Sequence, residues 1–136
     1  MIKIYSNVVK GLLLHQVCRF EEIQEERTNL CSDSSFIQCA ALNMNKGKTF
    51  KPHRHITKNR NEIYTPQESW IILKGIAKVF LYDTDDSLLA TYILKRGDSS
   101  FTFYGGHTYE IMENNTIVME YKTGPYEGQS NDKIFI

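Results

Sequence analysis

The sequence predicts an all-β protein, an antiparallel sandwich or barrel, and two observations carry that prediction. The last two thirds of the chain contain short segments rich in aromatic and β-branched residues, which are typical of strands. Gly, Asn and Asp residues that can reverse the chain separate these segments, and no helical pattern alternates with them, which disfavours a parallel α/β fold. The expected strands cover residues 35–44, 70–73, 77–82, 88–94, 101–104, 109–112 and 116–122.

One segment before these strands is predicted to be helical. In residues 16–28, Val17, Phe20 and Ile23 recur about once per helical turn, with glutamates between them. We expect residues 1–34 to form a strand and helix segment that packs on the outside of a barrel made by residues 35–136. A chain of 136 residues is long enough for one hydrophobic core and too short for two.

The composition argues against several classes of partner. The chain has 16 basic and 16 acidic residues, so its overall charge gives no electrostatic case for binding nucleic acid or an anionic membrane. No apolar run approaches the roughly 18 residues of a spanning helix, and the first residues lack a secretory signal pattern. The cysteines at 18, 31 and 39 share no paired spacing, so we expect free thiols. We therefore expect a cytoplasmic protein.

Three of the four histidines fall in a pattern that indicates a metal site. His53 and His55 are two residues apart, so on a strand both side chains leave the same face. Glu68 opens a later predicted strand, and His107 follows a Gly-Gly turn. Three imidazoles and one carboxylate, with room for water, suit Zn, Fe, Mn, Ni or Cu. We expect these four residues to bind one divalent metal ion.

The spacing of these residues resembles the two motifs of the cupin superfamily. The first motif reads G-x5-H-R-H-x12-E-x6-G over residues 47–75, and the second is GDSSFTFYGGH at residues 97–107. The resemblance implies a jelly-roll β-barrel that binds its metal inside the barrel through the motif positions. Phe103 stands where the second motif usually has Pro, and His107 arrives one residue early.

The first motif also carries an insertion. Twelve residues, 56–67, lie between His55 and Glu68, where the superfamily motif has three or four. We expect this insertion to form a flap at the mouth of the barrel, and it leaves Glu62 and Gln67 as alternative ligands.

Three stretches resemble the WbuC family of cupin-fold metalloproteins, which is found among bacterial O-antigen and capsule biosynthesis genes. They are RTN at residues 27–29, IQCAALNMNKGKTFKPHRH at residues 37–55 and MEYKTGPY at residues 119–126. The resemblance extends from residue 27 to about residue 133. It implies a metal-binding cupin linked to surface polysaccharide or nucleotide-sugar metabolism, and it leaves the reaction open.

Further residues are candidates for chemistry and binding. Glu120 and Lys122 share one face of the last predicted strand, either inward or outward, and with Tyr109 they are the candidates for proton transfer. The candidates for substrate binding, with core packing as the alternative for the aromatic residues, are Arg54, Trp70 and Tyr126. A basic cluster beside the first motif could bind the phosphates of a nucleotide sugar, or be a solvated loop: Lys46, Lys48, Lys51, Arg54, Lys58 and Arg60.

The three-His plus Glu set, together with what the WbuC resemblance implies, favours metal-dependent isomerisation or epimerisation of a sugar or nucleotide sugar. Three alternatives stay open: a non-catalytic module that binds a carbohydrate or a partner enzyme, a small-molecule cupin dioxygenase, and a metal-free epimerase whose histidines act as acid and base. We expect a homodimer paired through edge strands.

Overall fold

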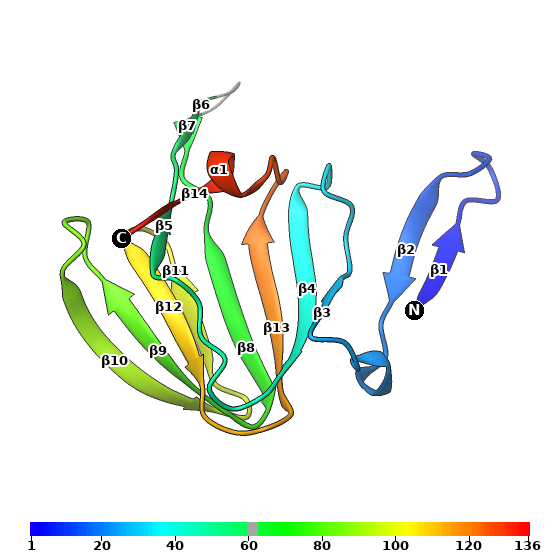
Figure 1. Cartoon of the computed structure of the whole chain (residues 1–136). Coiled ribbons are helices and arrows are strands. Elements are labelled where there is room, and N and C mark those ends of the chain that lie inside the picture. Colours follow the sequence, from blue (N-terminus) through cyan, green and yellow to red (C-terminus); the bar gives the residue numbers. More distant parts are fainter. Residues whose placement is uncertain (60–62) are drawn as a thin grey trace.

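The protein is a sandwich of two antiparallel five-stranded sheets, as the computed structural model of residues 1–59 and 63–136 shows (Figure 1). In order across the first sheet the strands are β10 (Leu88–Lys95), β9 (Ile76–Tyr82), β12 (Gly106–Ile111), β5 (His53–His55) and β14 (Lys133–Phe135). Across the second sheet they are β11 (Ser99–Thr102), β8 (Glu68–Lys74), β13 (Thr116–Thr123), β4 (Ile37–Met44) and β3 (Arg27–Asn29).

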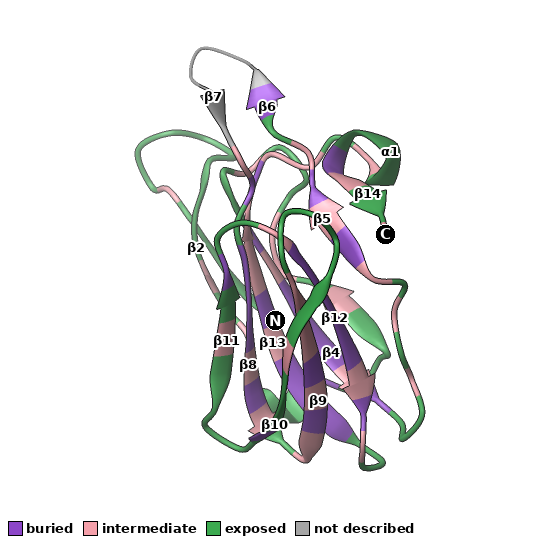
Figure 2. Ribbon diagram, turned by 90° about the vertical axis from the view of Figure 1, so that its left-hand side faces the viewer, coloured by how far each residue is buried: buried purple, intermediate pink, exposed green. Residues whose placement is uncertain are grey.

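The strand alternation seen in the sequence defines the core. Along β4 and β13 successive side chains alternate between the interior and the outer face, so Leu42 and Val118 point inward as cross-strand partners. Trp70, Ile72 and Val79 join them in one buried cluster between the sheets. Figure 2 shows buried residues along much of β8, β13 and β12. Each such side chain contributes about 1.5–3 kcal/mol of hydrophobic stabilisation on burial.

The fold is therefore all-β as predicted, but a closed barrel is not seen among the described residues. Each sheet keeps its own pair of edge strands, β10 and β14 in one and β11 and β3 in the other. The molecule is a two-layer sandwich, open at its edges.

The predicted helix at residues 16–28 is wrong. This stretch contains the end of β2 (Leu13–Val17), a single 3-10 turn η1 (Phe20–Glu22) and the first residues of β3. Ile23 is buried against Ala41 and Ile117 on the outer face of the second sheet, and β3 pairs with β4. Contacts with the sheet override a helical pattern that was too short to be stable by itself.

Two smaller hairpins complete the fold. Strands β1 (Ile2–Tyr5) and β2 form a two-stranded sheet that stands away from the sandwich (Figure 1). The insertion in the first motif contains a hairpin of β6 (Lys58–Asn59) and β7 (Ile63–Tyr64), at the same end of the molecule as α1 (Gln129–Asp132). Of the two alternative ligands there, Glu62 lies outside the described residues, and Gln67 is exposed.

Among the described residues, no helix has the length and apolar character needed to cross a membrane.

Candidate metal centre and adjoining cavity

The structure brings together the four residues that the histidine pattern singled out. His53 and His55 leave the same side of β5, His107 on β12 is the register partner of His53, and Glu68 opens β8 in the facing sheet. All four are buried, and one potential ligand atom of each lies within 4.8 Å of the others. This group of nitrogen and oxygen atoms from both layers could hold one divalent metal ion.

The hydrogen bonds of two imidazoles leave one ring nitrogen of each facing the group. Nδ1 of His53 lies 3.0 Å from the carbonyl oxygen of Lys51, and Nδ1 of His55 lies 3.3 Å from that of Asp132. Metal-binding histidines in general donate their second N–H to such an oxygen. With Nδ1 as the donor of the neutral ring, the lone pair of each Nε2 is the one that would bind a metal ion.

Nε2 of His55 gives the clearest test of whether the group fits a cation. This buried nitrogen has no hydrogen-bond partner, although Oε2 of Glu68 lies 3.3 Å away, within ion-pair distance. A buried polar atom without a partner is uncommon in folded proteins and costs free energy. A cation bound here would satisfy the nitrogen and the carboxylate together, so the residues present fit a metal ion.

The pKa values of His53, His55 and Glu68 shift in different directions. Burial, together with electrostatic repulsion from the neighbouring His107 and Lys133 side chains, lowers the pKa of His53 to about 4, so that its ring is neutral at pH 7. Burial also works against protonation of His55, but the nearby carboxylates of Asp132 and Glu68 outweigh it and raise the pKa to about 9. Burial acts to raise the pKa of Glu68, but the charges and hydrogen bonds of His107 and His55 hold it well below its ordinary value.

Asp132 contacts the candidate ligand His55. No pattern in the sequence predicted this contact. The buried carboxylate of Asp132 lies 3.4 Å from Nδ1 of His55, 3.4 Å from Nζ of Lys58 and 3.3 Å from Nζ of Lys122. Burial acts to raise the pKa of Asp132, but His55 and Lys122 lower it, so the carboxylate is ionised. One acidic side chain thus links the end of the chain to β5, β6 and β13.

Lys133, the next residue, was also missed. Its Nζ lies 3.2 Å from Nε2 of His53, the nitrogen that would face a metal ion. Burial lowers the pKa of Lys133. Strand β14 places Lys133 there by pairing with β5, where Lys133 is opposite His55. The alternation of KIF at residues 133–135 was the only signal in the sequence, and it is too short to predict a strand.

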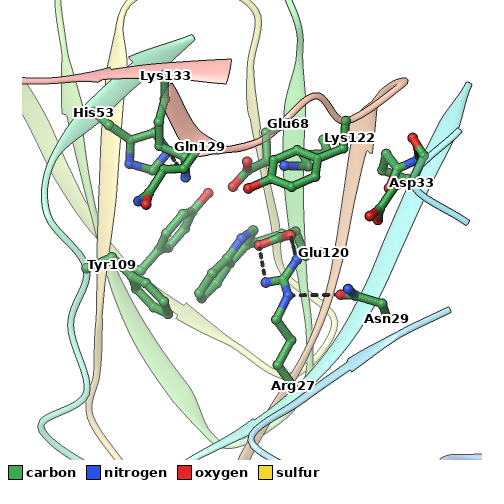
Figure 3. Close-up of a pocket in the computed structure, with 14 residues that line it drawn as sticks. Arg27, Asn29, Asp33, His53, Glu68, Tyr109, Glu120, Lys122, Gln129 and Lys133 are labelled. Carbon is green, nitrogen blue, oxygen red and sulfur yellow. Dashed lines mark hydrogen bonds and ion pairs between the residues drawn. The ribbon is translucent and has the colours of Figure 1, made fainter. Parts of the chain in front are cut away.

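A cavity of about 260 Å³ adjoins the metal candidates, and His53 and Glu68 form part of its wall (Figure 3). The sequence left open whether Glu120 and Lys122 face inward or outward, and both line this cavity. Tyr109 lines it as well. All three candidates for proton transfer therefore share one cavity with two of the candidate ligands.

Glu120 is held by an ion pair inside the cavity. Nη2 of Arg27 donates to Oε1 of Glu120 over 2.6 Å, and Nε of the same guanidinium donates to the side chain of Asn29 over 3.0 Å. Burial acts to lower the pKa of Arg27, but the carboxylate of Glu120 raises it. Figure 3 shows Arg27 reaching up from the edge of the sheet to this carboxylate.

Aromatic side chains form another part of the wall. The rings of Trp70 and Tyr109 stack with centroids 3.8 Å apart and planes 3° from parallel. The Tyr109 hydroxyl lies 2.7 Å from the hydroxyl of Ser100, and burial raises the pKa of Tyr109. Nε1 of Trp70 is buried without a hydrogen-bond partner. Tyr126 also lines the cavity, and Nζ of Lys122 lies 4.3 Å from the centroid of its ring.

The remaining predicted site residues lie elsewhere. Arg54 points away from the cavity, lines a separate hollow and has its Nε 3.3 Å from a carboxylate oxygen of Asp86. The basic cluster does not act as one surface, because Lys58 is buried against Asp132 and Lys48 pairs with Glu26. Arg60 lies outside the described residues.

Solved structures match this chain in fold. KdgF from Halomonas sp. is 15% identical over 74% of this chain and 78% of its own, with a TM-score of 0.57. CapF from Staphylococcus aureus, described as a capsular polysaccharide assembling protein, is 14% identical over 81% of this chain, with a TM-score of 0.65. Oxalate decarboxylase from Bacillus subtilis is 14% identical over 76% of this chain, with a TM-score of 0.58.

These similarities establish the cupin fold. The matched region is 31% of the CapF chain and 24% of the oxalate decarboxylase chain, so this protein corresponds to less than a third of either. No protein-family model matches the sequence, and no curated protein matches it.

Proposed function

We propose that this protein is a metal-dependent cupin of the WbuC type that isomerises or epimerises a sugar or nucleotide sugar in bacterial surface polysaccharide biosynthesis. The observation that carries the proposal is the position of His53, His55, Glu68 and His107 beside a polar cavity that also contains candidate proton-transfer groups. The similarity in fold to CapF, which is described as assembling capsular polysaccharide, supports the choice of substrate class.

The metal would be held by three imidazoles and one carboxylate. When bound, a divalent ion supplies Lewis-acid polarisation of a substrate oxygen, which acidifies the neighbouring C–H bond. His53 and His55 would present Nε2, because the Nδ1 of each is already bonded to a backbone oxygen.

The cavity residues would position the sugar and move the proton. The carboxylate of Glu120 faces the cavity and is the candidate base, with Arg27 fixing its orientation. Because the pKa of Tyr109 is raised, its hydroxyl stays protonated and serves as a donor. The free N–H of Trp70 and the ring of Tyr126 are suited to a hydroxylated ligand. Arg54 lies outside the cavity, so we do not include it among the sugar-binding residues.

Solvent exchange tests this reaction directly. The metal-loaded protein is incubated in D2O with a panel of sugars and nucleotide sugars, and deuterium incorporation is followed by NMR and mass spectrometry. We expect exchange at the carbon next to a carbonyl group of the substrate, and its loss in Glu120→Gln. A matched control is Glu110→Gln, which changes a carboxylate of β12 that does not line the cavity.

A binding module without catalysis is the second candidate, and one observation favours it. Both ionisable cavity residues of β13 are already paired, Glu120 with Arg27 and Lys122 with Asp132. A carboxylate held in such a pair has a fixed orientation, and the pair is suited to recognise hydroxyl groups. Measurable affinity for a sugar without exchange under any metal would select this function. Oxygen uptake by the iron-loaded protein would instead select a dioxygenase.

A further inference from the structure

Lys133 differs from the other two lysine and arginine residues that line the cavity beside the metal candidates. Nη2 of Arg27 lies 2.6 Å from a carboxylate oxygen of Glu120. Nζ of Lys122 lies 3.3 Å from a carboxylate oxygen of Asp132. Among the described residues, no carboxylate lies within ion-pair distance of Nζ of Lys133. Lys133 is therefore a cation of the cavity that no direct ion pair in the described part of the chain neutralises.

The acceptor that Lys133 does have is the nitrogen a metal ion would use. Nζ of Lys133 lies 3.2 Å from Nε2 of His53. Because Nδ1 of His53 is bonded to the carbonyl oxygen of Lys51, the lone pair on Nε2 accepts this hydrogen bond. One lone pair cannot serve an ammonium group and a metal ion together. Metal binding would therefore remove the acceptor of Lys133 and place further positive charge beside its ammonium group.

The backbone fixes Lys133 at this place. Strand β14 pairs with β5, and Lys133 is the register partner of His55. Its side chain is partly buried, and Figure 3 shows it beside His53 at the wall of the cavity. A partly buried ammonium group without an acceptor costs free energy. A negatively charged ligand in the cavity would offset that cost.

Two more hydrogen-bond donors of the cavity are without a partner in the described part of the chain. Nε1 of Trp70 is buried and unpaired. The side-chain amide of Gln129, four residues before Lys133, also lines the cavity. Figure 3 shows Gln129 near Lys133 and His53. These donors suit a ligand that is rich in hydrogen-bond acceptors.

The carboxylates of the cavity do not offset the charge at Lys133. Glu68 is one of the metal candidates, and Glu120 is paired with Arg27. Asp33 lines the cavity as well, but Figure 3 shows it across the cavity from Lys133. With a divalent ion bound, the wall around Lys133 would therefore carry excess positive charge.

We propose that Lys133 is a specificity-determining residue that binds a negatively charged group of the substrate, a carboxylate or a phosphate, beside the metal ion. This inference rests on the proposed function and narrows its substrate class to sugars that carry an anionic group. Lys133 forms an ion pair with that group, and Gln129 donates a further hydrogen bond to it. A neutral sugar leaves Lys133 unpaired and binds more weakly.

Calorimetric titration of the zinc-loaded full chain tests this role through binding, without turnover. The probes are glycolate, inorganic phosphate and ethylene glycol, which is a neutral molecule similar in size to glycolate. We expect at least one of the two anions to bind about tenfold or more tightly than ethylene glycol. Preference for glycolate indicates a sugar acid as the substrate, and preference for phosphate indicates a sugar phosphate.

Substitution of Lys133 separates its contribution from that of the metal. Lys133→Met keeps most of the length of the side chain and removes its charge. We expect it to lose about tenfold or more in affinity for the preferred anion, and Lys133→Gln to do the same. Lys51→Met is the matched control, because Nζ of Lys51 lies 5.5 Å from the ring of Phe135 on the same strand but outside the cavity. Circular dichroism and zinc content confirm that each variant is folded and loaded.

Three results would overturn the proposal: no anion binding by the zinc-loaded wild type, unchanged affinity in both Lys133 variants, or an equal loss in Lys51→Met. Deuterium exchange distinguishes these results from failure of the proposed function. Exchange with neutral sugars as fast as with acidic ones would retain the isomerisation and remove the role of Lys133. Anion binding that depends on Lys133, without exchange in any sugar, would retain that role and remove the isomerisation.

Discussion

Oδ2 of Asp132 lies 3.4 Å from Nδ1 of His55, and both side chains are 1% exposed. This contact couples the last turn of the chain to a residue of the candidate metal centre 77 positions earlier. The same carboxylate lies beside Lys58 and Lys122. Asp132 therefore holds the imidazole of His55 in the orientation that presents Nε2 to the group.

Replacing Asp132 by Asn should weaken metal binding. The amide keeps the size of the side chain but removes the negative charge behind His55, and loss of such a supporting partner typically costs about 10- to 100-fold in metal affinity. Competition with a chromogenic chelator measures the affinity of Asp132→Asn. Ser130→Ala, in the same helical turn but exposed, is the control and should bind as the wild type does. Equal affinities of Asp132→Asn and wild type would refute a supporting role for Asp132.

The pH dependence of stability should reveal the charge of His55 in the metal-free protein. Its pKa is about 9 in the folded state against an ordinary value of 6.5. A raised pKa means that the folded state binds the proton more tightly, so the contribution to stability is complete below pH 6.5 and is lost as the pH rises through 9. His53 has a pKa of about 4, so it is neutral in both states above 6.5 and adds nothing in this window.

Urea unfolding of the chelator-treated protein between pH 6.5 and 9 provides the measurement. Groups that do not contact His55 contribute equally to wild type and to His55→Gln, so the difference between the two reports His55 together with the two carboxylates beside it, Glu68 and Asp132. We expect the difference in unfolding free energy to shrink or change in favour of the variant as the pH rises. A difference that does not depend on pH would show that His55 is not protonated in the folded protein.

Two glycines with the same backbone conformation should respond differently to alanine. Gly75 and Gly97 have φ of 81° and 90°, where a residue with a Cβ is strained by about 1–3 kcal/mol. A Cβ on Gly97 meets open space, whereas one on Gly75 would come within 2.9 Å of the Thr116 backbone. Gly75→Ala should therefore lower the unfolding free energy clearly more than Gly97→Ala. Equal losses in chemical denaturation would mean that the contact with Thr116 relaxes without cost.

The strands and the pair of His53 and His55 could be predicted because their signals are local. Alternation along a strand such as β4 depends on neighbours two residues apart, and the spacing of His53 and His55 places both on one face. Glu68 and His107 were predicted from the spacing of the cupin motifs. That spacing supplied information about contacts across the two sheets that no local pattern contains.

The parts that failed depend on contacts between distant residues. Residues 16–28 do not form the predicted helix, because burial of Ile23 on the outer face of the sheet stabilises a different conformation. Asp132 and Lys133 reach the site because a three-residue strand pairs with β5, and no local pattern marks that pairing. The ion pair of Arg27 with Glu120 joins residues 93 positions apart, for which the sequence offers no spacing rule.

Elemental analysis of the purified protein tests the central claim most directly. The account predicts one divalent metal ion per chain, a large loss of metal in His53→Ala and His107→Ala, and no loss in His15→Ala, which removes the exposed histidine of β2. A folded wild-type protein that contains no metal and takes up none when Zn, Fe, Mn or Ni is supplied would contradict it, and the buried histidines would then be left to act without a cation.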